Sequence, residues 1–279
     1  MNRTGNIKQP LLTFFLLTYA IFWLLILLTG TLTLLNVPKP ILNTLIVICS
    51  WSPSFAFLFL FRKLYPNITL KDFLKQQFCS RIKFSVLIVL LLVHIFILIA
   101  ARATYSFINE TPVFFVLSAS FGAIVSGFFS HLIKGPLGEE LGWRAYALND
   151  LQKRFSPLIS AILLGLVWGF WHAPLWFLTS GYSGMDLFKY IALFMVCIIS
   201  TSIVITAFYS INKNLVIPVV IHLLFNLMFT LVGLDALQAL EYISPWYLLF
   251  VLVLLIVNPK KALYGAAILG RRDCPSFRF

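Results

Sequence analysis

Acidic side chains are rare in this sequence, and so is charge of any kind. The 279 residues include 9 Asp and Glu against 21 Lys and Arg, and charged residues make up 11% of the chain. Hydrophobic residues make up 61%, well above the roughly 45 to 50% of an ordinary soluble domain. The longest polar stretch, from Arg62 to Lys83, has only 22 residues. The composition therefore excludes a separate soluble domain, and we expect residues 1–279 to form one transmembrane domain.

Two sequence patterns are also missing. The chain contains no His-Glu-x-x-His motif, which excludes the zinc-peptidase arrangement of two histidines one turn apart on a helix. It shows no convincing internal repeat of the kind that marks many transporters. The missing repeat weakens the interpretation that the chain is a transporter.

Eight stretches are apolar and long enough to cross a bilayer, which takes about 20 residues in a helix. They lie near 11–35, 41–61, 84–101, 112–133, 158–178, 187–209, 215–233 and 244–257. The mean hydropathy of +0.97 agrees with this count. The sequence thus predicts an all-α, polytopic membrane protein with about eight transmembrane helices. The last stretch is short, and we expect its helix to begin earlier, around Leu240.

The basic residues are distributed unevenly between the loops of this topology. With the N-terminus in the cytosol, 18 of the 21 Lys and Arg fall on the cytosolic side, and only Lys39, Arg102 and Lys189 fall outside. Cytosolic loops of membrane proteins carry such an excess of positive charge. We therefore expect both termini in the cytosol. The net charge of +12 reflects topology and contact with the lipid bilayer, and it does not indicate a nucleic-acid partner.

Residues 135–150, GPLGEELGWRAYALND, place two adjacent carboxylates and an arginine in this charge-poor chain. A Gly-Pro pair interrupts the apolar run, and we expect a helix from about Gly138 to Arg154. Proline and acidic residues are both favoured in a first helical turn. Glu139 and Glu140 therefore open this helix.

The two carboxylates have different neighbours on the expected helix. Glu140 precedes Arg144 by four residues, in the order that favours an ion pair. Glu139 has Trp143 as its neighbour one turn on and lacks a charged partner. A carboxylate beside an indole in a partly dry site has a raised pKa, which suits a general base. Taken alone, the three charged residues also fit a solvated cluster at the cytosolic interface.

Two histidines lie inside apolar runs, His172 in WGFWHAPLW and His222 in VVIHLLFNLM. Asn226 follows His222 by four residues, so the two side chains share one helix face. Trp168, one turn before His172, can form a wall of the same site. Buried imidazole and amide groups need hydrogen-bond partners, and each alone also fits packing between helices. Their combination with the glutamate pair favours a functional site.

The other two histidines are His94 in the third apolar stretch and His131 near the cytosolic end of the fourth. Neither has a companion such as the His222–Asn226 pair provides. We interpret both as packing or interface residues.

Three motifs follow one another within the stretch 112–233. They are Glu-Glu-x-x-x-Arg (Glu139, Glu140, Arg144), aromatic-x-x-x-His (Trp168, His172) and His-x-x-x-Asn (His222, Asn226). This order resembles the CPBP intramembrane protease family, which includes the CaaX prenyl endopeptidases and the Abi proteins linked to bacteriocin immunity. Trp168 stands where phenylalanine is commoner. The resemblance implies an eight-helix fold with a cavity in the membrane and hydrolysis of a peptide bond in a hydrophobic or prenylated peptide.

Two mechanisms are compatible with the motif residues. In the first, Glu139 and His172 activate water while His222 and Asn226 stabilise the oxyanion, without a metal. In the second, Glu139, His172 and His222 bind Zn²⁺, which lowers the pKa of a bound water to about 7. Asn226 is a poor zinc ligand but a good donor to an oxyanion in either scheme. We prefer the metal-free mechanism.

The expected helices place the two site histidines at different depths. At 1.5 Å per residue, His172 lies roughly 22 Å from the cytosolic end of a helix that begins at Pro157. His222 lies only roughly 10 Å into a helix that begins at Leu215. The two can meet only if helices tilt or if the boundaries of the helix with His172 are wrong.

Two other functions remain open at the level of sequence. An immunity protein of the same fold could protect its host by sequestering a partner, with the motif residues secondary. A transporter could use Glu139, Glu140 and the histidines as a proton relay, because ionisable residues inside membranes often serve that role. For the location, a bacterial plasma membrane is preferred and the endoplasmic reticulum stays open.

Overall fold

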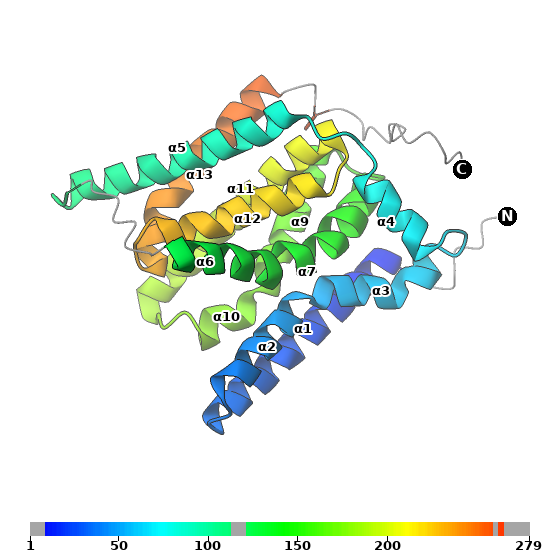
Figure 1. The fold of residues 1–279 in the computed structure, drawn as a ribbon, viewed down its shortest axis with the longest axis horizontal. Coiled ribbons are helices and arrows are strands. Elements are labelled where there is room, and N and C mark those ends of the chain that lie inside the picture. Colours follow the sequence, from blue (N-terminus) through cyan, green and yellow to red (C-terminus); the bar gives the residue numbers. More distant parts are fainter. Residues whose placement is uncertain (1–8, 113–120, 259–261, 265–279) are drawn as a thin grey trace.

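The protein is all-α in the computed structural model, which describes residues 9–112, 121–258 and 262–264. The helices in chain order are α1 (Pro10–Leu34), α2 (Lys39–Ser50), α3 (Ser52–Leu64), α4 (Leu70–Phe78), α5 (Phe84–Ile108), α6 (Phe121–Lys134), α7 (Pro136–Glu140), the π-helix η1 (Leu141–Leu148), α8 (Asn149–Leu151), α9 (Pro157–Trp171), α10 (Ala173–Leu178), α11 (Gly184–Asn212), α12 (Val216–Leu231) and α13 (Ala236–Val257). Figure 1 shows their arrangement. The described ranges contain no strand, which confirms the expected fold class.

Five stretches are long and apolar enough to cross a membrane: α1, α5, α9 with α10, α11, and α13. The bent pair α2 and α3 can supply a sixth, and α12 is a shorter apolar helix. The expected span 112–133 corresponds in part to α6, but residues 113–120 lie outside the described part of the chain. The protein is thus an integral membrane protein, while the count of eight spans and the cytosolic termini stay predictions.

Helix α11 forms the centre of the molecule and packs mainly on α9 and α13. In its most apolar window 61% of the residues are buried, against 22% in α1. Close approach of α9 is possible because Gly165 has no side chain: a Cβ there would lie 2.9 Å from the Cα of Ile199 on α11. Small residues at helix contacts are typical of membrane proteins. Helices α1 to α3 cover one side of this core, and α5 lies along α13 on the opposite side (Figure 1).

Two of the predicted helices are broken in the structure. The stretch 41–61 bends by 49° between α2 and α3, and Pro53 lies in the first turn of α3. The stretch 158–178 is interrupted at His172, and Pro174 lies in the first turn of α10. Proline lacks the N–H that would continue the preceding helix and collides with the carbonyl four residues before it. A proline therefore explains each break.

The helix expected over 138–154 is a composite of three segments. Helix α7 changes at Leu141 to the π-helix, and the short α8 follows before the chain turns toward α9. A π-helix bonds residues five apart, and π-helical turns are frequent at functional sites. The change in winding alters which side chains share a face beyond Glu140.

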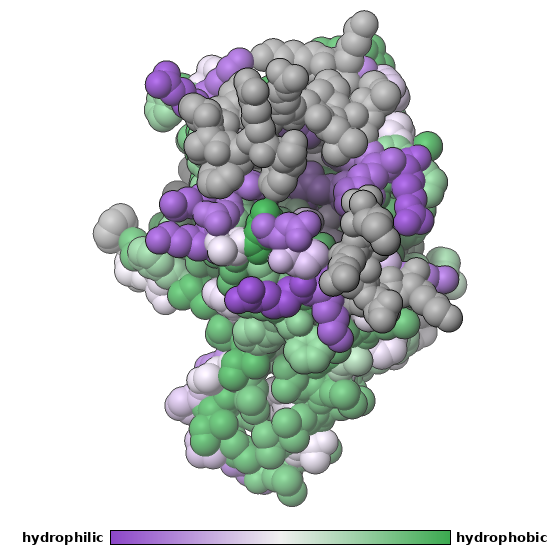
Figure 2. Space-filling view, turned by 90° about the vertical axis from the view of Figure 1, so that its right-hand side faces the viewer, coloured by the Kyte–Doolittle hydropathy of each residue, from purple (hydrophilic) through white to green (hydrophobic). Residues whose placement is uncertain are grey.

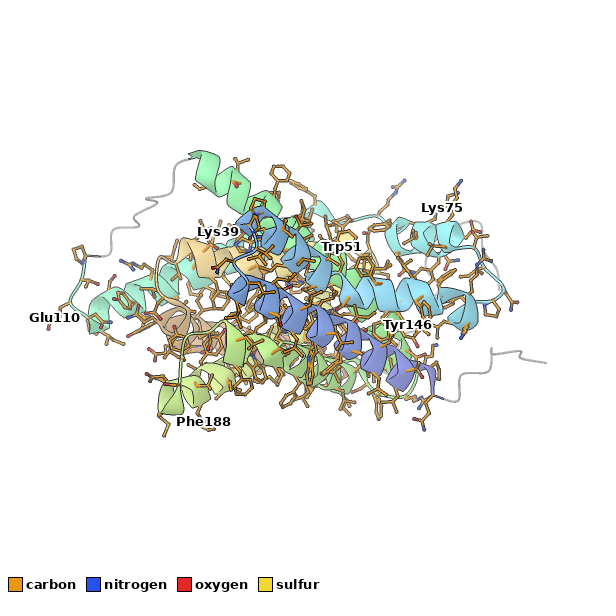
Figure 3. The ribbon with its side chains drawn as sticks, turned by 90° about the horizontal axis from the view of Figure 1, so that it is seen from below. Lys39, Trp51, Lys75, Glu110, Tyr146 and Phe188 are labelled. Atoms are coloured by element: carbon orange, nitrogen blue, oxygen red, sulfur yellow. The ribbon has the colours of Figure 1, made fainter. Side chains whose placement is uncertain are left out.

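One end of the molecule carries several exposed basic side chains. In Figure 3 Lys75 lies toward the end of the molecule that carries α4, and Lys39 lies away from that end. Hydrophilic side chains gather at the end that carries α4 (Figure 2). The side chains of Arg62, Lys63 and Lys71 are exposed there.

Candidate active site

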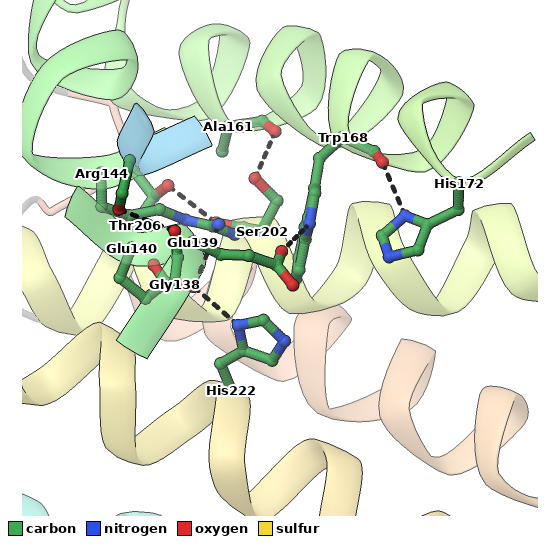
Figure 4. A network of polar contacts seen from close by, with 11 residues as sticks. Gly138, Glu139, Glu140, Arg144, Ala161, Trp168, His172, Ser202, Thr206 and His222 are labelled. Atoms are coloured by element: carbon green, nitrogen blue, oxygen red, sulfur yellow. Dashed lines mark hydrogen bonds and ion pairs between the residues drawn. The ribbon is translucent and has the colours of Figure 1, made fainter. Parts of the chain in front are cut away.

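The three sequence motifs meet in the interior of the helix bundle. The site residues are Glu139 and Glu140 on α7, Arg144 on η1, Trp168 on α9, His172 between α9 and α10, and His222 and Asn226 on α12. Glu139, Glu140, Arg144, Trp168 and His222 are buried, whereas His172 and Asn226 are partly buried. In Figure 4 the Glu139 carboxylate and the Trp168 indole lie between the rings of His172 and His222. Helices far apart in sequence thus supply one polar cluster.

Glu140 binds two partners through one carboxylate oxygen. Its Oε1 accepts from Arg144 Nη1 at 3.2 Å and from His222 Nδ1 at 2.7 Å. The predicted ion pair with Arg144 is confirmed, and the bond to His222 is an addition that helical spacing could not reveal. A carboxylate oxygen only accepts, so the proton of this bond sits on Nδ1 of His222. Glu140 therefore fixes the ring and leaves Nε2 facing away.

Glu139 is held by an indole, but not by the one expected from spacing. Its Oε2 accepts from Trp168 Nε1 at 2.7 Å. The ring of Trp143 instead contacts Phe14 and Trp171, at centroid distances of 5.6 and 6.0 Å. The predicted neighbour was therefore wrong, because the change to π-helical winding at Leu141 turns Trp143 away from α7.

The environment of Glu139 favours the protonated acid. Helix α7 lies outside the candidate membrane spans, yet Glu139 is only 3% exposed. Loss of solvation on burial raises the pKa of Glu139 to about 7, although the nearby His222 and the bond from Trp168 act in the opposite direction. A carboxyl group with a pKa near 7 can accept and return a proton at neutral pH.

His172 is held by a backbone carbonyl in an aromatic setting. Its Nδ1 lies 2.8 Å from the carbonyl oxygen of Trp168, so Nδ1 is the donor and the neutral ring has its lone pair on Nε2. The ring lies 4.6 Å from the ring of Trp171 and 5.2 Å from that of Phe194. Because α9 ends at Trp171, His172 lies at a break within the expected span 158–178.

His222 and Asn226 face one small space beside the break between α6 and α7. A Cβ on Gly135 would lie 2.9 Å from Nδ2 of Asn226 and 3.4 Å from Nε2 of His222. The two nitrogens therefore border the same point, as the four-residue spacing predicts. Gly135 leaves room for both because it has no side chain.

Trp168 contacts more of the site than any spacing argument indicated. Its ring lies 4.2 Å from Cζ of Arg144 and 5.0 Å, edge to face, from the ring of His222. The ring of His172 lies 6.1 Å away. Together with the bond to Glu139, these contacts bring the indole next to residues of all three motifs.

Two glycines of the first motif region were missed by the sequence analysis. A Cβ on Gly138 would lie 2.6 Å from Cδ1 of Trp51, and a Cβ on Gly142 would lie 2.5 Å from the carbonyl oxygen of Pro53. Ser54 Oγ also donates to the carbonyl of Gly138 at 2.7 Å. The glycines allow the bend between α2 and α3 to press against the helix that carries the carboxylates. Their four-residue spacing is a signal that could have identified them.

The remaining histidines make contacts that suit packing. His94 Nδ1 lies 2.7 Å from the carbonyl of Leu90, and its Nε2 lies 3.3 Å from the hydroxyl of Tyr247 on α13. His131 Nε2 lies 2.8 Å from Oγ1 of Thr230 on α12. His94 thus joins α5 to α13, and His131 joins α6 to α12.

The expected zinc ligands do not form a ligand set. Within the described ranges, no group of three or more His, Cys, Asp or Glu side chains is arranged to hold a metal ion. Glu139 is bound to the Trp168 indole and His222 to Glu140 instead. The residues as placed do not fit a three-ligand site of Glu139, His172 and His222, and zinc binding stays a prediction.

Comparison with known proteins matches the region that carries this site. Residues 122–228 match the family described as type II CAAX prenyl endopeptidase Rce1-like. The CAAX prenyl protease 2 of Methanococcus maripaludis is 33% identical over 131 residues, which cover 45% of this chain and 47% of the relative. The chain thus spans about half the length of the curated relative it matches. All the site residues lie within residues 122–228, and the resemblance to the CAAX endopeptidases is confirmed.

Proposed function

We propose that this protein is an intramembrane endopeptidase that hydrolyses a peptide bond in a prenylated, CaaX-like protein or peptide. The observation that carries the proposal is the meeting of all three motifs in one buried cluster within the segment that matches the CAAX endopeptidases. The similarity to a protein named CAAX prenyl protease 2 supports the substrate class. A bacterial plasma membrane is the proposed location.

Glu139 is the proposed general base. Its second carboxylate oxygen accepts no hydrogen bond from the described side chains, so it can bind a water. Nε2 of His172, which carries the lone pair when the ring is neutral, can accept from the same water. Glu139 takes a proton as the water oxygen attacks the scissile carbonyl carbon. When the carbon–nitrogen bond breaks, the protonated Glu139 returns that proton to the leaving amine.

His222 and Asn226 are the proposed oxyanion donors. In its charged form the His222 ring carries a proton on both nitrogens, and the one on Nδ1 is bonded to Glu140. Nε2 of the charged ring and Nδ2 of Asn226 then both present N–H groups to the developing oxyanion. Removing one such donor from a hydrolase typically lowers kcat by about 10² to 10³.

The test is cleavage of a prenylated CaaX peptide by the detergent-purified protein. We expect the wild type to cleave it and Glu139→Gln to cleave it about 10² to 10⁴ times more slowly, because the amide cannot accept the proton. Asp150→Asn is the matched control, since Asp150 pairs with Lys153 on the surface, and it should keep wild-type activity. An unprenylated peptide of the same sequence tests the substrate class.

A chelator distinguishes the two mechanisms in the same assay. The metal-free mechanism predicts unchanged cleavage after treatment with a zinc chelator, and loss that added zinc restores would contradict it. If the folded wild type cleaves no prenylated peptide, the protease proposal fails and sequestration of a partner becomes the better explanation.

A further inference from the structure

Trp168 is bound to the proposed base through a group that phenylalanine lacks. Its Nε1 donates to Glu139 Oε2 at 2.7 Å, with 0% of Trp168 and 3% of Glu139 exposed. Hydrogen bonds to an ionised acceptor are roughly twice as strong as neutral ones. No other side chain in the described ranges donates to the Glu139 carboxylate. The indole therefore determines where this carboxylate lies.

The ring is itself held on several sides. The guanidinium of Arg144 lies over it, with Cζ at 4.2 Å from the centroid, and the His222 ring meets it edge to face at 5.0 Å. At the next residue, a Cβ on Gly169 would come within 2.4 Å of Sδ of Met195, so α9 packs closely against α11. A cation over the ring face also draws electron density from the indole and strengthens its N–H as a donor. Trp168 is thus a rigid donor and not a mobile one.

The backbone of the same residue orients a second site residue. The carbonyl oxygen of Trp168 accepts from Nδ1 of His172 at 2.8 Å. The side chain of Trp168 thus holds Glu139 while its carbonyl holds the His172 ring (Figure 4). Because Trp168 is fully buried, it is positioned behind the reacting groups and does not contact the substrate.

We propose that Trp168 is a positioning residue that holds Glu139 in the orientation for proton transfer through its indole N–H. The proposal rests on the protease function above. A phenylalanine at this position would fill the space without the bond. In this chain, orientation of the base depends on one hydrogen bond between α9 and α7.

The experiment compares Trp168→Phe with Trp143→Phe in the cleavage assay. Trp143 is also fully buried and lies one turn from the carboxylates, but its Nε1 has no partner in the described ranges. Both variants lose the same ring volume, and only the first loses a bond to Glu139. We expect Trp168→Phe to lower kcat by about 10 to 100-fold, because a small displacement of a reacting group has effects of that order.

The two kinetic constants separate positioning from substrate binding. For Trp168→Phe we expect KM to stay within about twofold of wild type, and for Trp143→Phe we expect kcat to stay within about threefold. Equal losses of kcat in the two variants would overturn the proposal, and so would wild-type kcat in Trp168→Phe. Loss through KM alone would also contradict it, since that is the signature of altered substrate binding.

A spectroscopic arm tests the bond without using activity. In protein labelled at tryptophan, the indole N–H resonance that disappears in Trp168→Phe belongs to Trp168, and we expect it downfield of a free indole. The Trp168 resonance should move upfield in Glu139→Ala. If the alanine variant does not fold, Glu139→Gln replaces it, and a smaller upfield movement is expected. An unmoved resonance in both variants overturns the hydrogen bond. A folded wild type that cleaves nothing contradicts the protease function itself, which distinguishes the two failures.

Discussion

Two regions of the molecule each bury a histidine among apolar helices, and they differ in what the ring binds. Between α5 and α13, His94 bonds a carbonyl of its own helix and the hydroxyl of Tyr247. Between α7, α9 and α12, His222 bonds the Glu140 carboxylate, which also binds Arg144. The first region uses both ring nitrogens on neutral partners. The second keeps Nε2 of His222 beside Gly135 and Asn226, where a substrate group could be bound.

The comparison shows which feature of a buried histidine indicates chemistry. Burial is equal in the two regions, with His94 2% and His222 4% exposed. Charge is not equal, because only His222 is bonded to a carboxylate, which is itself paired with an arginine. Buried charges are costly to maintain and are tolerated when they are paired. The charged neighbours, and not the depth of the ring, therefore identify the site.

The largest expected effect is on stability, at the charged pair itself. Glu140→Gln removes the partner of a fully buried Arg144, and loss of one member of a buried pair destabilises by about 3 to 5 kcal/mol. Asp150→Asn breaks the partly exposed pair with Lys153 and should cost about 0 to 1 kcal/mol. Unfolding in detergent monitored by circular dichroism measures both. Equal stability of the two variants would mean that Arg144 finds another partner.

The next effect separates the two histidines by activity. His222→Phe should lower kcat on the prenylated peptide by about 10² to 10³, the loss typical of one oxyanion donor. His94→Phe should leave kcat near wild type and lower stability by about 1 to 3 kcal/mol, because the Tyr247 hydroxyl loses a buried partner. A comparable loss of activity in His94→Phe would show that the two regions do not differ as proposed.

A smaller effect tests the packing that supports the carboxylates. Gly142→Ala would bring a Cβ to 2.5 Å from the carbonyl of Pro53, and such overpacking costs about 1 to 3 kcal/mol. Gly30→Ala in α1 meets no atom within 4 Å and should stabilise by about 0.5 to 1 kcal/mol, because alanine is the better helix former. The thermal midpoints of the two variants should move in opposite directions.

The smallest expected effect is a pH dependence that only the site region produces. With the pKa of Glu139 raised to about 7, kcat/KM should fall about tenfold per pH unit below that value, since the base must be ionised. For stability the sign is opposite. Folding raises the pKa of this carboxyl. Its protonated form therefore contributes fully to the free energy of unfolding below about pH 4.5, and that contribution is lost as pH rises through about 7.

Glu139→Gln is the control for the stability measurement. It should remove this decline in the free energy of unfolding between about pH 4.5 and 7, because the amide does not titrate. His94→Phe, in the other region, should leave the decline in place. A decline that persists in Glu139→Gln would assign it to a different group.

Properties that depend on short stretches of chain were predictable. Hydropathy identified seven of the described apolar helices or helix pairs, since a span needs only about 20 consecutive apolar residues. The spacing of Glu140 and Arg144 predicted their ion pair, and the spacing of His222 and Asn226 predicted a shared face. The breaks at Trp51 and His172 were missed although Pro53 and Pro174 were visible, because proline is also compatible with an unbroken, kinked helix.

The sequence by itself determined the membrane class, the helical fold and the identity of the motif residues, because hydropathy and helical spacing are local properties of the chain. Only the tertiary structure decided that Glu139 binds Trp168 and not Trp143, and that Glu140 orients His222. Those partners come from other helices or from a change of helical winding, and their choice depends on how α7, α9 and α12 pack. A buried polar group bonds whatever donor the packing brings within reach, which spacing along one helix cannot reveal.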